Sequence, residues 1–220
     1  MTENPRVFGA DYSVYVRIVR LCLIEKGVEY ELLPIDVFAE EGPPQSYLAR
    51  HPFGRIPAFE HAGFWLYETS AITRYIDETF GEPKLQPSGA RARARCNQLV
   101  SIADNYAYPQ LVWGVYVERV SKAGRGAASD EAKIGAAIAK ARVCLTAMSH
   151  LMGDNPWLAG AELTLADLYA APMFDYFLKA PEGRNMIREH ENLATWWSRV
   201  AERPSVKATA PLSFRISLLP

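Results

Sequence analysis

The sequence predicts a small α/β domain followed by an all-helical domain. Three observations support this. Residues 6–36 have the pattern of a strand, a helix and a strand, a two-residue turn at 62–63 joins two apolar runs, and helical spacing dominates beyond residue 90. With 220 residues, the chain is long enough for each domain to bury its own core.

The opening segment is predicted to form a strand, a helix and a second strand. The strand "RVFGAD" (6–11) ends in turn residues, and the helix over 12–27 carries its apolar residues on one face. Ser13 occupies the N-cap position, and Gly27 stands where a helix stops. Together with a strand over 28–36, this unit favours two parallel strands joined by a right-handed crossover.

A short irregular helix is expected in the polar, proline-containing segment 37–51. A hairpin follows, in which "IPAFEH" and "FWLYE" flank the turn at Ala62 and Gly63, whose glycine tolerates a positive φ. A helix over 69–80 completes the first domain.

The segment 81–90 is rich in proline and glycine and breaks the pattern. We therefore expect an N-terminal domain over 1–82, a linker over 83–90 and a helical domain over 91–220.

The second domain is expected to contain a long helix over 90–120, bent at Pro109, and another helix over 131–152. Thr164 and Asp167 have the spacing of a capping box, although glutamate or glutamine is the usual partner. A closing helix and a tail of uncertain structure follow, over 191–204 and 204–220.

Composition and charge argue against several classes of function. The net charge of −1 creates no field that would favour nucleic acid or an anionic membrane, and the apolar runs are too short to span a bilayer. The N-terminus lacks the pattern of a signal peptide, so a cytoplasmic protein is expected. The odd, widely spaced cysteines and the histidines form no metal-ligand pattern, which favours packing cysteines and no metal (Cys22, Cys96, Cys144, His51, His61, His150, His190).

Pro57, at the start of the hairpin, has two interpretations. A trans proline is the common one, because a missing N–H costs nothing at a strand's first residue. A cis Ile56–Pro57 bond would instead turn the N–H and C=O of Ile56 outward, ready to pair with an extended, peptide-like ligand.

Glu68 and Thr69 lie at a strand-to-helix junction. The amides of the first helical turn point out of the helix and can bind a carboxylate, while the Glu68 side chain can hold an ammonium group. Together they suit the α-amino-acid end of a ligand. A plain helix cap is the structural alternative.

Ser13 lies at the carboxyl end of the first strand, where open α/β sheets bind their ligands. Its hydroxyl, beside helix amides, can donate a hydrogen bond to a bound thiolate. We do not expect Ser13 to be a nucleophile, because no histidine or lysine base lies nearby in the sequence. Capping the helix is a sufficient structural role for it.

Four stretches in this order resemble the cytosolic glutathione S-transferases: "RVFGADYSVYVRIVRLCLIEKGVEYE", "HPFGRIPAFEH", "LYETSAITRYI" and "LTLADLYAAP". The resemblance covers nearly the whole chain, and the first third is most similar to the serine-type classes, particularly the phi class and bacterial relatives. It implies a thioredoxin-like N-terminal domain, a helical-bundle C-terminal domain, a homodimer and a role in detoxification with glutathione as co-substrate.

The resemblance also implies roles for single residues. Ser13 matches the serine that hydrogen-bonds the glutathione sulfur. Ile56 matches the residue whose main chain pairs with the cysteinyl unit, and Pro57 the cis-proline after it. Glu68 and Thr69 match the pair that holds the γ-glutamyl end.

Two positions depart from the phi pattern. Arg55, which is also placed in the glutathione site, replaces a common glutamine, while Gly42 and Pro43 stand where basic residues often bind the glycyl carboxylate. That contact is either lost or supplied by one of three nearby cations: Arg50, His51 or Arg55.

The implied reaction is attack of the glutathione thiolate on a small, hydrophobic electrophile. Tyr12, another implied glutathione-binding residue, and Tyr15 are the alternatives to Ser13 for stabilising the thiolate. The electrophile pocket is expected between the domains, where apolar sites are common. Its candidate lining residues are Tyr15 and three aromatic residues of the long helix, for which core or dimer packing is the alternative: Tyr108, Trp113 and Tyr116.

Other functions remain open on this scaffold. Peroxide reduction and dehalogenation need no different glutathione site, whereas the thiol–disulfide reductases of the family use a cysteine where this chain has Ser13. A non-catalytic ligand-binding protein is a further alternative, which the replacement of basic residues by Gly42 and Pro43 keeps open.

Overall fold

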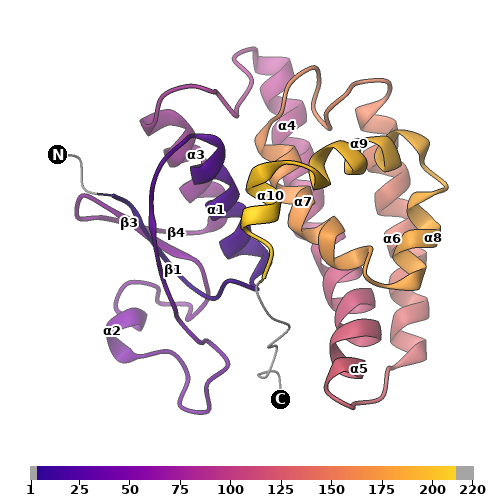
Figure 1. The fold of residues 1–220 in the computed structure, drawn as a ribbon, viewed down its shortest axis with the longest axis horizontal. Helices are drawn as coiled ribbons and strands as arrows, with labels where there is room; N and C mark the ends of the chain where they lie inside the picture. Colours follow the sequence, from indigo (N-terminus) through magenta and orange to yellow (C-terminus); the bar gives the residue numbers. More distant parts are fainter. Residues whose placement is uncertain (1–3, 212–220) are drawn as a thin grey trace. The chain divides into compact units, whose positions relative to one another are not determined.

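The computed structural model describes residues 4–211. These residues divide into two compact units, which we call unit 1 (4–84 with 207–211) and unit 2 (Leu85–Val206). Unit 1 contains a mixed sheet with helices, and unit 2 is helical (Figure 1). The predicted fold class is thus confirmed. The remainder of the tail predicted over 204–220 lies outside the described residues.

The sheet of unit 1 has the strand order β2-β1-β3-β4. Strand β1 (Arg6–Phe8) pairs in parallel with β2 (Glu31–Leu33) and antiparallel with β3 (Ala58–His61), which in turn pairs antiparallel with β4 (Phe64–Tyr67). The predicted parallel pair and hairpin are confirmed. Both turn residues of the hairpin have positive φ, 52° at Ala62 and 80° at Gly63.

Helices cover both faces of this sheet. Helices α1 (Val14–Glu25) and α3 (Thr69–Thr79) lie side by side on one face, and α2 (Gln45–Leu48) lies on the other (Figure 1). Alternation along the strands explains this: Phe59 packs edge-on against Tyr75 of α3, whereas the ring of Phe8 lies 4.9 Å from that of Trp65 on the α2 side.

A buried ion pair joins the ends of α1 and α3. Lys26 is 7% exposed, and its Nζ lies 3.2 Å from the Asp77 carboxylate and 2.8 Å from the Pro83 carbonyl oxygen. Because a buried ammonium needs several acceptors to offset its desolvation, this contact fixes where the chain leaves α3.

Unit 2 is built from helices connected by short loops. The helix predicted over 131–152 is confirmed as α6, and α10 follows the last helix of the bundle. The elements are α4 (Ala90–Ile102), η1 (Ala103–Ser121), α5 (Lys122–Gly124), α6 (Glu131–Met152), α7 (Leu165–Phe177), α8 (Pro181–Ile187) and α9 (Glu191–Ala201), while α10 (Pro204–Ala208) begins in unit 2 and ends in unit 1.

The long helix predicted over 90–120 changes its geometry at Ala103. Helix α4 continues without a break into η1, a π-helix with Pro109 in its interior. The N–H of Lys122 accordingly bonds to the carbonyl oxygen of Val117, five residues back. An apolar pattern with the α-helical period does not distinguish the two geometries.

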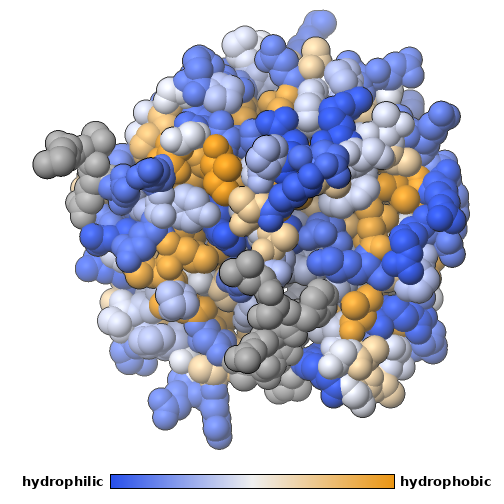
Figure 2. Space-filling view, in the orientation of Figure 1, coloured by the Kyte–Doolittle hydropathy of each residue, from blue (hydrophilic) through white to orange (hydrophobic). Residues whose placement is uncertain are grey.

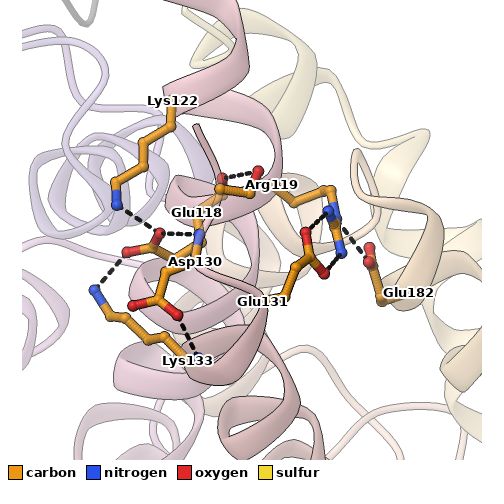
Figure 3. Close-up of polar contacts among 8 residues, drawn as sticks. Glu118, Arg119, Lys122, Asp130, Glu131, Lys133 and Glu182 are labelled. Carbon is orange, nitrogen blue, oxygen red and sulfur yellow. Dashed lines mark hydrogen bonds and ion pairs between the residues drawn. The ribbon is translucent and has the colours of Figure 1, made fainter. Parts of the chain in front are cut away.

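Two ion-pair clusters join the end of η1 to neighbouring helices (Figure 3). Glu118 is 1% exposed and accepts from Lys122 at 2.7 Å and from Lys133 of α6 at 2.5 Å. The next residue, Arg119, pairs with acidic groups of α6 and α8, Glu131 and Glu182.

Apolar side chains also reach the surface. On the face drawn in Figure 2 they gather in separate patches among polar ones. Among the described residues, the large apolar side chains that are most exposed are Phe53, Phe64, Tyr106 and Val143. Within residues 4–211, the helices are all too short or too polar to cross a membrane.

Candidate active site

The register of the sheet brings three separate segments to one end of it. Phe8 of β1 lies opposite Ala58 of β3, and Ala58 lies opposite Tyr67 of β4. The residues just after Phe8, just before Ala58 and just after Tyr67 therefore lie at the same edge. These three segments carry the candidate site residues Ser13, Ile56, Pro57, Glu68 and Thr69.

Gly9 allows two of these segments to approach each other. Its φ is +154°, and a Cβ built on it would lie 2.4 Å from Cγ2 of Val16 and 3.1 Å from Cβ of Ile56. Real Cβ atoms do not approach other atoms to 2.4 Å, so a side chain here would push the first turn of α1 away from the segment before β3. We did not foresee this contact, although a glycine after a short strand is its signature.

Ser13 is the N-cap of α1, as predicted. Its backbone is extended (φ −67°, ψ 128°), and its Oγ accepts a hydrogen bond of 3.4 Å from the N–H of Val16. The capping bond uses a lone pair of the hydroxyl, and within residues 4–211 the hydroxyl proton is donated to no other group. Ser13 can therefore cap the helix and donate a hydrogen bond at the same time.

Two tyrosines flank Ser13, and both are half-buried. Burial, reinforced by the negative charges of Asp36 and Asp11, raises the pKa of Tyr12. Tyr12 is therefore a neutral hydroxyl at physiological pH, able to donate a hydrogen bond but unable to act as a base.

The Ile56–Pro57 peptide bond is cis, which confirms the less common of the two interpretations. Pro57 is buried and Ile56 is partly exposed. In the part of the chain that the structure describes, the main-chain N–H and C=O of Ile56 have no hydrogen-bond partner. The preceding carbonyl, that of Arg55, is held by the Tyr47 hydroxyl at 2.6 Å.

Glu68 does not act as a side-chain cap for α3. Its side chain makes no capping bond, and the residue has φ +70° and ψ 112°, a backbone conformation that is uncommon for any residue except glycine. The carboxylate is exposed and forms no hydrogen bond or ion pair with residues 4–211. Thr69, 8% exposed, begins helix α3. The N–H groups of the first helical turn point out of the N-terminal end of the helix.

The three cations considered for a glycyl carboxylate differ in their surroundings. The guanidinium of Arg50 lies over the Trp65 ring, 4.6 Å from its centroid, and His51 is only 2% exposed. Arg55 is exposed, and its side chain makes no ion pair or hydrogen bond with the described residues. Arg55 thus has no partner among the described residues, whereas Arg50, also exposed, is stacked on Trp65.

The aromatic residues assigned to an electrophile pocket are distributed over both units. Tyr15 lies on α1 in unit 1, whereas the others lie on η1 in unit 2. Tyr108 and Trp113 are partly exposed and pack edge to face, with ring centroids 6.5 Å apart. Tyr116 is 1% exposed and stacks on Tyr176 at 4.6 Å, so its ring belongs to the core of unit 2.

Comparisons with known proteins agree with this geometry. Residues 7–84 match the model of the glutathione S-transferase N-terminal domain, and residues 127–208 match that of the glutathione S-transferase C-terminal domain. The chain is 30% identical to glutathione S-transferase F7 of Arabidopsis thaliana, an alignment that covers 92% of this chain and 97% of that protein. It is 28% identical to glutathione S-transferase F12 of the same plant, over 92% and 95% of the two chains.

Solved structures show the same similarity. The crystal structure of glutathione transferase F2 from Populus trichocarpa superposes with a TM-score of 0.84 at 27% identity, covering 93% of this chain and 96% of that one. A glutathione S-transferase from Rhodospirillum rubrum gives a TM-score of 0.81 at 28% identity, over 98% and 96%. The chain belongs to the glutathione S-transferase family.

Proposed function

We propose that this protein is a glutathione transferase that binds glutathione on unit 1 and activates its sulfur as a thiolate for attack on a small, hydrophobic electrophile. The observation that supports this most strongly is the convergence of three segments at one end of the sheet. They bear Ser13, Ile56 and Glu68, each with an unpaired group suited to one part of a γ-linked tripeptide.

Each part of glutathione has a partner on this edge. The Glu68 carboxylate binds the γ-glutamyl ammonium, while the amides at Thr69 bind the adjacent carboxylate at a helix N-terminus. The main chain of Ile56, before Pro57, pairs with the cysteinyl unit. Arg55 supplies the positive charge for the glycyl carboxylate.

The sulfur is activated by hydrogen bonding. A free thiol with a pKa near 8.5 is about 3% ionised at neutral pH, and lowering that pKa by two units costs about 2.7 kcal/mol. One hydrogen bond to a charged group supplies roughly 1.5–3 kcal/mol, and a helix N-terminus adds about 0.3–1 kcal/mol. Ser13 at the start of α1 is therefore sufficient, with Tyr12 as a second neutral donor.

The domains, the oligomeric state and the location of the protein complete the proposed function. Residues 1–82 form the glutathione-binding domain and 83–90 the linker, and 91–220 contribute the electrophile site, for which Tyr108 and Trp113 are the partly exposed aromatic candidates. A homodimer would cover exposed apolar side chains such as Phe53, 67% exposed. The three free, buried cysteines (Cys22, Cys96, Cys144) are compatible with a reducing, cytoplasmic location.

Substitution of Ser13 tests the mechanism. In Ser13→Ala we expect the pKa of the bound thiol to rise by about one to two units and kcat/KM with a chloronitrobenzene electrophile to fall about tenfold or more near pH 6.5. The pH–rate profile and the ultraviolet absorbance of the bound thiolate report both. Tyr12→Phe and Tyr15→Phe are the matched variants: an unchanged profile in Ser13→Ala with a shifted one in either of them would move the role to that tyrosine.

The type of reaction needs a second measurement. Assays with glutathione and a panel of aryl halides, haloalkanes and hydroperoxides separate conjugation from dehalogenation and peroxide reduction. Retention on immobilised glutathione without turnover of any of them would identify a non-catalytic binding protein instead.

A further inference from the structure

His51 is a buried histidine that the proposed mechanism does not use. It follows α2 and is 2% exposed, and its backbone N–H bonds to the carbonyl oxygen of Tyr47 at 2.9 Å. Its imidazole stacks on the ring of Tyr67 at 4.8 Å with an interplanar angle of 29°, and it meets Phe53 edge to face at 6.3 Å. The Nδ1 atom is buried and has no hydrogen-bond partner among the described residues.

The position of this ring links the two segments that carry the candidate glutathione contacts. Tyr67 lies opposite Ala58 in the β3–β4 pair and immediately precedes Glu68, the residue with φ +70°. Phe53 opens the short segment that leads to Ile56 and Pro57. The imidazole therefore packs against the residue before Glu68 and against the start of the segment before β3.

We propose that His51 is a positioning residue for the γ-glutamyl end of glutathione: the neutral imidazole supports the backbone at Tyr67 and Glu68, and its protonation draws the Glu68 carboxylate away from the ligand ammonium. This inference rests on the proposed function. It assigns to His51 no contact with the ligand, because the ring is buried.

The charges around His51 determine whether its protonation favours or opposes ligand binding at Glu68. Burial lowers the pKa of His51, and the positive charge of Arg55 adds to that shift, whereas the negative charge of Glu68 and the backbone of His51 itself oppose it. The rings of Tyr47 and Tyr67 lie 6.0 and 4.8 Å from the imidazole, and burial raises the pKa of Tyr47, so its hydroxyl is neutral. The guanidinium of Arg50, the preceding residue, lies over Trp65. Among the described residues, the anionic group that acts on this imidazole is Glu68, and the ligand ammonium competes with a protonated His51 for the same carboxylate.

The coupling makes glutathione affinity fall as the pH falls. Binding of an ammonium at Glu68 neutralises the negative charge that favours protonated His51, so ligand binding at acidic pH releases a proton from the histidine. S-methylglutathione is the suitable probe, because its thioether cannot ionise and the sulfur contributes no proton.

Calorimetric titration with S-methylglutathione between pH 7.5 and 5.0 tests this. In the unmodified protein we expect the Kd to rise about threefold or more, with proton release visible as a dependence of the heat on buffer ionisation enthalpy. His51→Phe keeps a stacking ring that cannot titrate, so its Kd should match that of the unmodified protein at pH 7.5 and stay level on acidification. His51→Ala lacks the ring and should bind more weakly at every pH, with a raised KM for glutathione and an unchanged kcat.

His61→Phe is the matched control, since His61 lies in the same unit and its Nδ1 lies 2.9 Å from the Tyr75 hydroxyl, on α3. It should retain the pH dependence of the unmodified protein. Level affinity in the unmodified protein, the same pH dependence in His51→Phe, or tight binding by His51→Ala would each overturn the role of His51. Absence of binding at pH 7.5 in the unmodified protein would overturn the proposed function as well.

Discussion

The indole Nε1 of Trp196 donates a hydrogen bond of 2.8 Å to the carboxylate of Asp167, a residue with no exposed surface. The same carboxylate accepts the N–H groups of Leu158 and Thr164, each at 2.8 Å. One buried side chain therefore holds together the start of α7, the loop before it and α9. The capping box predicted from the spacing of Thr164 and Asp167 is present. The hydrogen bond from Trp196 also connects this capping box to α9.

Replacement of Asp167 by alanine should be strongly destabilising. It removes the acceptor from four donor groups at once, the N–H of Leu158, the N–H and hydroxyl of Thr164 and the indole N–H of Trp196, so we expect the free energy of unfolding to fall by about 3–5 kcal/mol. Chemical denaturation followed by tryptophan fluorescence measures this. Thr164→Ala is the control and should cost about 1 kcal/mol. Equal losses in the two variants would mean that the bonds from Trp196, Leu158 and the Thr164 N–H together contribute little.

Gly9→Ala should affect both stability and glutathione binding. The new Cβ would lie 2.4 Å from Val16 and 3.1 Å from Ile56, so we expect a loss of about 1–3 kcal/mol in stability together with a raised KM for glutathione. Gly27→Ala is the matched control, because Gly27 also has positive φ (+66°) but has open space around it. It should lower stability without changing KM; a raised KM in both variants would point to a general loss of folding.

Glu68→Gln should weaken the binding of glutathione selectively. Loss of the charge that faces the ligand ammonium removes a charge-assisted hydrogen bond of about 1.5–3 kcal/mol, so KM for glutathione should rise about tenfold or more while kcat at saturation changes little. Glu78→Gln, an exposed position on the same helix, serves as the control. A normal KM in Glu68→Gln would place the ammonium elsewhere.

Two glycines of unit 2 should respond to alanine in opposite ways. At Gly114 of η1, a Cβ would lie 2.4 Å from the Cβ of Ala137 on α6, so Gly114→Ala should cost about 1–3 kcal/mol. A Cβ at Gly135 of α6 would meet no atom within 4 Å beyond its chain neighbours and its own helix backbone, so Gly135→Ala should stabilise the protein by about 0.4–1 kcal/mol through the unfolded state. Melting temperatures of the two variants should therefore move in opposite directions.

Glu118 should make stability depend on pH in the acidic range. Burial acts to raise the pKa of Glu118, but the bonds from Lys122, Lys133 and the backbone of Asp130 outweigh it and hold that pKa at about 2. The folded pKa is below the unfolded value of about 4.3, so the stabilisation is present above that value and is lost as the pH falls toward 2. In Glu118→Gln the free energy of unfolding should fall less steeply between pH 5 and 2. An unchanged slope would mean that Glu118 titrates normally.

Much of the fold follows from local patterns. The opening strand, helix and strand, the hairpin around Gly63, the helix Glu131–Met152 and the cap at Ser13 are all in the structure, because periodicity, turn residues and capping residues act over a few positions. The π-helical geometry of η1 was not foreseen, since it depends on how the helix packs. Gly114 shows this, because its close approach to Ala137 involves residues 23 positions apart in the sequence.

The residue types at the candidate site were likewise visible in the sequence by itself: a capping serine, a proline before a strand and an acidic residue before a helix. Only the tertiary structure decided which of their groups are free. The strand register brings the three segments together, and burial withdraws His51 and Tyr116 from ligand contact. Arg50 stacks on the ring of Trp65, while Arg55 forms no ion pair or hydrogen bond with the described residues. The physical reason is that burial and pairing depend on neighbours that are distant in the sequence, and a local pattern carries no information about them.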